Sequence, residues 1–203
     1  MTTEMWIIAA VRVAGSLPVL RWPFAGAILA MLVDLSDLFL RELIHLGGVR
    51  DYQSFDKYLD QVYMLTFLAV AVRWQPVPRN IAVGLYALRM LGFVAYEATG
   101  ERAVLLAFPN VFEFWFVFVA GLKFFGLEED EGRKPVLSRA EGEGLGWRRR
   151  FAYSPGQLAV VLPVLLAAKE FQEYALHGGR WLDSFTATEA VESVWDWLTG
   201  PFR

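Results

Sequence analysis

The stretch "WPFAGAILAMLVDLSDLFLREL" at residues 22–43 begins as an apolar run and ends in charged residues. Its first half has the composition of a membrane helix, which needs about 20 mostly apolar residues to cross the hydrocarbon. Its second half holds Asp34, Asp37, Arg41 and Glu42, with His45 just beyond. Charged groups are costly inside a membrane and commonly mark a functional site. The interpretation of this stretch therefore decides both the predicted fold and the predicted function of the chain.

The composition of the whole chain is typical of a membrane protein. Its 203 residues are 56% hydrophobic and 20% charged, whereas soluble domains are usually about 45–50% apolar and about 25% charged. The net charge of −3 gives no reason to expect a nucleic-acid partner. The absence of cysteine excludes disulfides, cysteine zinc sites and cysteine nucleophiles. We expect an integral membrane protein, in the inner (plasma) membrane of a bacterium, with membrane lipids as its surroundings.

Apolar runs predict six membrane helices and an all-α fold, a polytopic bundle with a C-terminal amphipathic helix within 186–200. The chain divides into residues 1–126, which carry the acidic motif, a charged mobile loop at 127–155, and residues 156–203. By the positive-inside rule the basic residues of the loop favour a cytoplasmic position, but the orientation stays open because it changes if the first segment does not cross the membrane. The six predicted spans are 5–20, 22–46, 57–74, 80–98, 104–126 and 157–176.

Helical spacing gathers the acidic residues into one constellation. Asp34, Asp37, Arg41 and His45 fall within about 80° of arc on a helix of 3.6 residues per turn. On the next helix, Asp56 and Asp60 are four residues apart and share a face. Four carboxylates on two antiparallel helices would repel one another, and cations would relieve that repulsion. Oxygen-only ligands favour Mg²⁺ or Mn²⁺, with Ca²⁺ as a third candidate.

A second interpretation of the same acids is structural. Residues at helix ends near the lipid headgroups can pair with nearby bases, here Arg41, Arg50 and Lys57. In that case the chain is a non-catalytic membrane subunit, and its partners are a second copy or other membrane subunits. A pathway for cations built from the same acids is a third interpretation.

The acidic pattern resembles the motif of the CDP-alcohol phosphatidyltransferases, D-x2-D-G-x2-A-R-x8-9-G-x3-D-x3-D. "DLSD" and "DKYLD" match its four aspartates with the nine-residue spacer: Asp34, Asp37, Asp56 and Asp60. The likeness covers roughly residues 5–125. The two motif glycines fall on Leu38 and Tyr52, and the arginine is displaced by one position, to Arg41. The chain is thus similar to a distant or degenerate member, in which activity is retained, altered or lost.

The resemblance implies phosphatidyl transfer and, with it, phospholipid biosynthesis. The four aspartates would hold the divalent cations, Asp60 would also be the general base, and Arg41 would contact phosphate. Elsewhere, Arg89 lies within an apolar run, either in an ion pair with Glu97 or Glu113 or as a second phosphate contact. The aromatic run "FEFWFVFVAGLKFFG" at 112–126 favours lipid contact at the membrane interface, with a partner-binding surface as the alternative.

Overall fold

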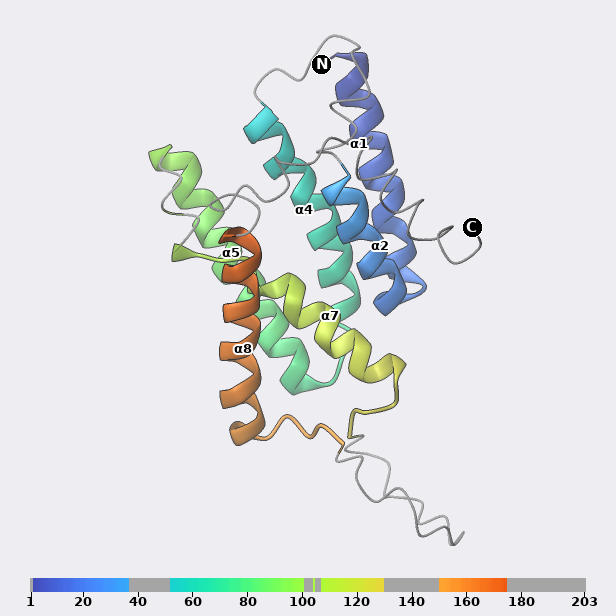
Figure 1. Cartoon of the computed structure of the whole chain (residues 1–203), viewed down its shortest axis with the longest axis vertical. Coiled ribbons are helices and arrows are strands. Elements are labelled where there is room, and N and C mark those ends of the chain that lie inside the picture. The colour runs from blue at the N-terminus through green and yellow to red at the C-terminus, as the bar shows by residue number, and fades with distance from the viewer. Residues whose placement is uncertain (1, 37–51, 101–103, 105–106, 130–149, 175–203) are drawn as a thin grey trace, which may run out of the picture. The chain divides into compact units, whose positions relative to one another are not determined.

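The computed structural model describes residues 2–36, 52–100, 104, 107–129 and 150–174, with only the backbone described at 52–54 and 56. These residues are mostly α-helical, and their only extended pairing is a single bridge between Glu128 and Phe151. The all-α prediction is therefore confirmed for this part of the chain (Figure 1). The chain forms two compact units, Met1–Thr66 with Lys169–Arg203 and Phe67–Ala168.

The first unit is built on a helical hairpin in which α1 and α2 pack side by side (Figure 1). The Thr2 hydroxyl accepts a hydrogen bond from the Met5 N–H and so caps α1. Proline sets both changes of direction, because Pro18 opens the 3₁₀ turn η1 and Pro23 occupies the first turn of α2. The elements are α1 (Thr3–Ser16), η1 (Leu17–Leu20) and α2 (Pro23–Leu35).

Two glycines allow the backbones of this hairpin to approach closely. A Cβ atom at Gly15 would lie 2.8 Å from Val33 Cγ2, and one at Gly26 would overlap the backbone of Pro18 and Val19. Small residues also make up the rest of the buried face of α2, which consists of Ala27 and Ala30. Membrane helices commonly pack through small residues in this way, since van der Waals contact between backbones replaces the hydrophobic effect.

Polar residues of α1 face the interior and apolar residues face outward. The buried positions include Glu4, Arg12 and Ser16, at helical spacing with Ile8. The exposed side chains of the same segment include five large apolar ones: Trp6, Val11, Val13, Leu17 and Leu20. An outward-facing apolar surface is unusual for a helix in water and is suited to contact with lipid.

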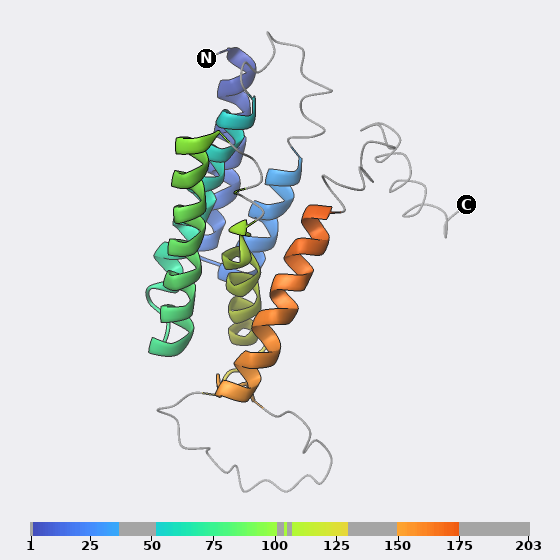
Figure 2. The ribbon, with the colours of Figure 1, turned by 90° about the vertical axis from the view of Figure 1, so that its left-hand side faces the viewer.

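The second unit contains the end of α4 (Tyr52–Ala71), α5 (Pro76–Thr99), α7 (Val111–Phe124) and most of α8 (Pro155–Glu173). Helices α5 and α7 pack against each other, and α8 continues as one helix through Pro163 (Figure 2). Gly100 ends α5 with a left-handed φ of 69°, and its N–H donates to the Tyr96 carbonyl. The exposed side chains of α5 include Val83, Leu88, Leu91 and Val94, so this helix too presents an apolar surface.

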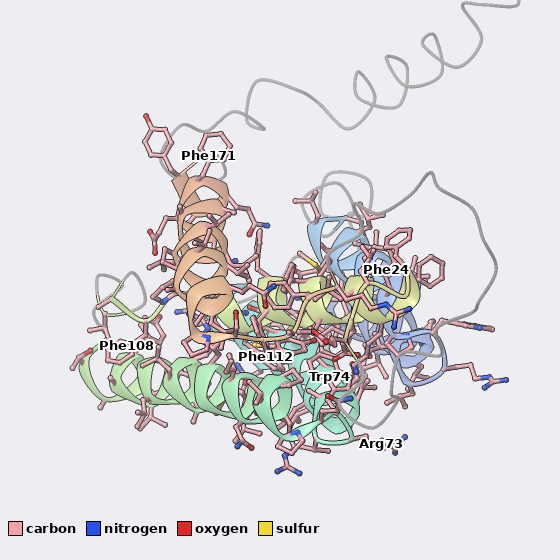
Figure 3. The ribbon with its side chains drawn as sticks, turned by 90° about the horizontal axis from the view of Figure 1, so that it is seen from below. Phe24, Arg73, Trp74, Phe108, Phe112 and Phe171 are labelled. Atoms are coloured by element: carbon pink, nitrogen blue, oxygen red, sulfur yellow. The ribbon has the colours of Figure 1, made fainter. Side chains whose placement is uncertain are left out.

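Aromatic side chains form the core of the second unit. Phe67 and Phe116 stack with ring centroids 4.2 Å apart, and Trp74 stacks on Phe116 at 5.1 Å. The buried Trp115 donates its indole N–H to the Pro78 carbonyl at 3.1 Å. Figure 3 shows Trp74 directed inward, whereas its neighbour Arg73 is exposed. The expectation of lipid contact is therefore wrong for the first half of the aromatic run, which is core, and the exposed rings are Phe124 and Phe125.

The predicted mobile loop has ordered ends. The Glu129 N–H donates to the Phe151 carbonyl, and the Phe151 N–H donates to the Leu127 carbonyl. The Glu128 carboxylate accepts hydrogen bonds from Lys123 at 2.5 Å and from the Tyr153 hydroxyl at 2.7 Å. Burial raises the pKa of the Tyr153 phenol above its usual value of 10.0, and the neighbouring Glu128 carboxylate raises it further. Residues 130–149 of the loop lie outside the described part of the chain.

Each of the six predicted spans coincides with a helical segment, although their lengths differ from the prediction. Among the described residues, two segments are long and apolar enough to cross a membrane, Thr3–Leu20 and Pro76–Thr99, and Pro23–Leu35 is a shorter apolar helix. The fifth predicted span is not one continuous helix: Val104 and Ala107 are helical, residues 108–110 are not, and α7 begins at Val111 after Pro109. The last part of the second predicted span and the C-terminal amphipathic helix lie outside the described residues.

Candidate functional site

The site is built around Arg12, which projects from the buried face of α1. Its side chain is 3% exposed, although an isolated guanidinium strongly prefers water. Arg12 lies one helical turn after Ile8 and one turn before Ser16, so the same spacing that buries those residues also buries the arginine. An arginine in this position requires negative partners from the neighbouring helices.

Two aspartates from two different helices supply those partners. Asp34, in the last turn of α2, forms an ion pair with Arg12 through its Oδ1. Asp60, in α4, accepts a hydrogen bond from Arg12 Nη2 at 2.6 Å, also through Oδ1. One nitrogen of the guanidinium therefore contacts a carboxylate oxygen of each helix, and the three side chains join α1, α2 and α4.

We refer to Arg12, Asp34 and Asp60 together as the Arg12 cluster. The three side chains differ in how far they are exposed to solvent. The side chain of Asp34 is 34% exposed and that of Asp60 is 19% exposed, against 3% for Arg12. With all three groups ionised, the cluster carries a net charge of −1. The carboxylates are thus the part of the cluster that a solute in water would meet first, and they would attract a cation.

Two of the four predicted metal ligands meet in this cluster. Asp34 and Asp60 are the first and the last acids of the motif, and both contact Arg12. Asp56 lies in α4 one turn before Asp60, but its side chain is not described. Asp37 and Arg41 fall within 37–51 and so lie outside the described residues, as does His45.

The donor set suits a hard divalent cation. Carboxylate oxygens of Asp34 and Asp60 converge on one point that already holds a positive charge. Oxygen ligands of this kind favour Mg²⁺, Mn²⁺ or Ca²⁺. Within the described ranges, no group of three or more Asp, Glu or His side chains is close enough together to hold a metal ion. A complete coordination shell would therefore also need Asp37 or Asp56, which the motif places one helical turn from Asp34 and from Asp60.

The sequence prediction missed Arg12, which lies within the first predicted span, 5–20. A usable signal was present in the stripe of Glu4, Ile8, Arg12 and Ser16, which repeats every four residues. An i, i+4 repeat that mixes charged with apolar residues in a membrane helix indicates an interior polar face.

Arg89, the second predicted phosphate contact, lies in the other unit. Its Nη1 donates to the backbone carbonyl of Phe108 at 3.2 Å. Of its two proposed carboxylate partners, Glu113 is buried and accepts a hydrogen bond from Asn110 Nδ2 at 2.5 Å, whereas Glu97 is exposed. The observed partner of Arg89 is therefore a backbone group at the start of the α7 segment, which gives the arginine a structural contact.

Comparisons with protein-family models, with curated proteins and with solved structures found no match for this chain. The fold and the site themselves define an all-α protein with outward-facing apolar helices. Its distinguishing feature is a buried arginine held by two aspartates of neighbouring helices.

Proposed function

We propose that this chain is a polytopic membrane protein of the phosphatidyltransferase type that uses divalent cations at Asp34, Asp37, Asp56 and Asp60. The observation that supports the proposal best is the meeting of Asp34 and Asp60 at a single cationic group. These two acids open and close the D-x2-D…D-x3-D pattern, so a site built from that pattern requires them to converge. Their position on helices with exposed apolar faces suits a lipid substrate.

The proposed reaction transfers a phosphatidyl group to an alcohol. The hydroxyl oxygen of the acceptor would form a bond to the phosphorus of the donor, the bond from phosphorus to the leaving group would break, and Asp60 would take the hydroxyl proton. Bound divalent cations would neutralise charge on the phosphate oxygens. The resemblance assigns this role to Asp60 as the last acid of the motif, and the 19% exposure of its side chain leaves it accessible to an acceptor alcohol.

Leu38 affects which donor lipid the proposed site would accept. The resemblance places a glycine there, where it leaves room for the nucleotide, and a leucine side chain would fill that space. We therefore expect weak binding of CDP-containing lipids by the unmodified protein and tighter binding by Leu38→Gly. Isothermal titration with a CDP-lipid measures both, and tight binding by the unmodified protein would contradict the expectation.

The proposal is tested by combining stability with turnover. The purified protein should melt at a higher temperature with Mg²⁺, Mn²⁺ or Ca²⁺, and it should transfer a phosphatidyl group in a lipid assay with one of these ions present. Asp60→Asn should lower turnover by about 10²–10⁴-fold, the usual contribution of a general base. Glu97→Gln is the matched control, since Glu97 is an exposed acid in α5. If divalent cations do not stabilise the protein and no phosphatidyl transfer is observed, the proposal is wrong.

A second candidate function is supported by a separate observation. Arg12 already contacts both Asp34 and Asp60 and offsets part of their charge, so these acids have a structural explanation that needs no metal. In this alternative the chain is a non-catalytic membrane subunit, and the exposed apolar faces of α1 and α5 bind lipid, a second copy or other membrane subunits. The same melting experiment separates the two functions, because the subunit should show no response to divalent cations.

A further inference from the structure

The position of Arg12 creates a conflict with any cation that binds the same acids. Arg12 Nη2 contacts Asp60 Oδ1 at 2.6 Å and also contacts Asp34 Oδ1. A Mg²⁺ or Ca²⁺ ion that is coordinated by both oxygens would lie about 2.0–2.6 Å from each of them. That location coincides with the nitrogen, so the guanidinium and the metal ion cannot bind both acids at the same time.

We propose that Arg12 is a built-in counter-cation that a divalent cation must displace before it can bind Asp34 and Asp60. The inference rests on the proposed cation site and adds a positioning residue to it. Without metal, Arg12 keeps the two halves of the acidic motif together and compensates their charge. When a metal ion binds, the guanidinium moves away from the acids. The free energy of its interaction with the acids is then lost, so the metal ion binds more weakly than it would in a protein without Arg12.

The exposures of the three side chains are consistent with this exchange. A hydrated cation can approach Asp34 and Asp60 from the solvent side, where they are 34% and 19% exposed, while Arg12 contacts them from the protein side. The backbone of α1 near the cluster is held by close packing of Gly15 against Val33. The exchange would therefore involve rotation of the long arginine side chain, whose rotatable bonds allow movement without displacement of the helix.

The exchange predicts that removal of Arg12 strengthens metal binding. Mn²⁺ binding to the full-length protein in detergent micelles can be measured by electron paramagnetic resonance, since free Mn²⁺ gives a strong signal that bound Mn²⁺ loses. Arg12→Gln should bind Mn²⁺ about tenfold more tightly or better, because a competing cation and its repulsion are both removed. Arg12→Lys keeps the charge and should bind Mn²⁺ about as the unmodified protein does.

The matched control is Arg21→Gln. Arg21 is an exposed arginine at the end of η1, on the same hairpin as Arg12 but away from the acids. The same change of charge at this position should leave the Mn²⁺ affinity within about twofold of that of the unmodified protein, because exposed charges are screened by water and salt. A rise in affinity in both glutamine variants would mean that total charge, and not displacement of Arg12, controls binding, and would overturn the inference.

A small-molecule competition experiment tests the exchange directly and does not depend on Arg12→Gln being well folded. Arg12→Ala leaves a space that methylguanidinium can enter, and the added cation should raise the melting temperature of this variant. Methylguanidinium should also weaken Mn²⁺ binding to Arg12→Ala competitively, whereas it should have little effect on Arg21→Ala. A purely structural role for Arg12 predicts restored stability with no effect on Mn²⁺ affinity.

The possible results separate this inference from the proposed function. If the unmodified protein binds Mn²⁺ and Arg12→Gln binds it equally or more weakly, the counter-cation role is wrong and the metal site stands. If neither the unmodified protein nor any Arg12 variant binds Mn²⁺, the metal site and the counter-cation role are both wrong. Tighter binding by Arg12→Gln alone, with competition by methylguanidinium, supports both.

Discussion

Removing one acid from the Arg12 cluster should destabilise the protein more than removing the whole cluster. Asp60→Asn leaves the guanidinium of Arg12, 3% exposed, with Asp34 as its remaining partner in the cluster. Breaking a fully buried ion pair costs about 3–5 kcal/mol. Asp60 is 19% exposed, so water can replace part of the lost interaction, and we expect a loss of about 2–4 kcal/mol in the free energy of unfolding.

The same reasoning applies to removal of Asp34 and to removal of all three charges together. Asp34 is 34% exposed, so Asp34→Asn should cost less, about 1–2 kcal/mol. The triple variant Arg12→Met, Asp34→Asn, Asp60→Asn contains no uncompensated charge in the cluster. Replacing a buried ionic group by uncharged side chains of similar size is often neutral or stabilising. We therefore expect the triple variant to be at least about as stable as Asp60→Asn alone.

Unfolding of the purified protein in mixed micelles with increasing sodium dodecyl sulfate, followed by tryptophan fluorescence, gives these free energies. Arg21→Met is the control, and it should change stability by less than about 0.5 kcal/mol because Arg21 is exposed. A triple variant whose loss equals the sum of the three single losses would refute the reasoning. Such additivity would mean that the three side chains act independently and do not form one charged cluster.

Two further predictions concern packing and the loop ends. Gly26→Ala should cost about 1–3 kcal/mol in the same assay, because the new methyl group overlaps the backbone of Pro18 and Val19. Gly84→Ala, which meets nothing within 4 Å, should be neutral or stabilising by up to about 1 kcal/mol. Equal effects at the two glycines would contradict the close packing of η1 and α2. The phenol of Tyr153 should titrate above its usual value of 10.0, as measured by ultraviolet absorbance against Tyr153→Phe. Since the folded state holds this proton more tightly than the unfolded state, the stability contributed by Tyr153 is complete below about pH 10 and decreases as the pH rises further; equal loss of stability at alkaline pH in the two proteins would contradict this assignment.

Local sequence was sufficient to locate the helices. Runs of apolar residues act over short distances and predicted where most helices lie, but not their bounds: the fourth span, expected at 80–98, begins at Pro76 in the structure, with proline in its first turn. The prediction was wrong in one respect at the fifth span: Val104 and Ala107 are helical as expected, but the helix is interrupted around Pro109 and α7 begins at Val111. The spacing of Asp34 and Asp60 also predicted that acids of two helices would face one another.

Tertiary structure alone decided what those acids contact. Whether carboxylates on two helices meet a metal, a lysine or an arginine depends on which third helix packs against them, and no local pattern fixes that choice. Here Gly15 of α1 packs against Val33 of α2, and Gly26 of α2 packs against η1, and this packing directs Arg12 to Asp34 and Asp60. The aromatic run could not be assigned from sequence either, because a hydrophobic side chain is equally suited to contact with lipid and to burial in the protein core. Contact with Phe67, Trp74 and Pro78, all distant in sequence, places Phe116 and Trp115 in the core.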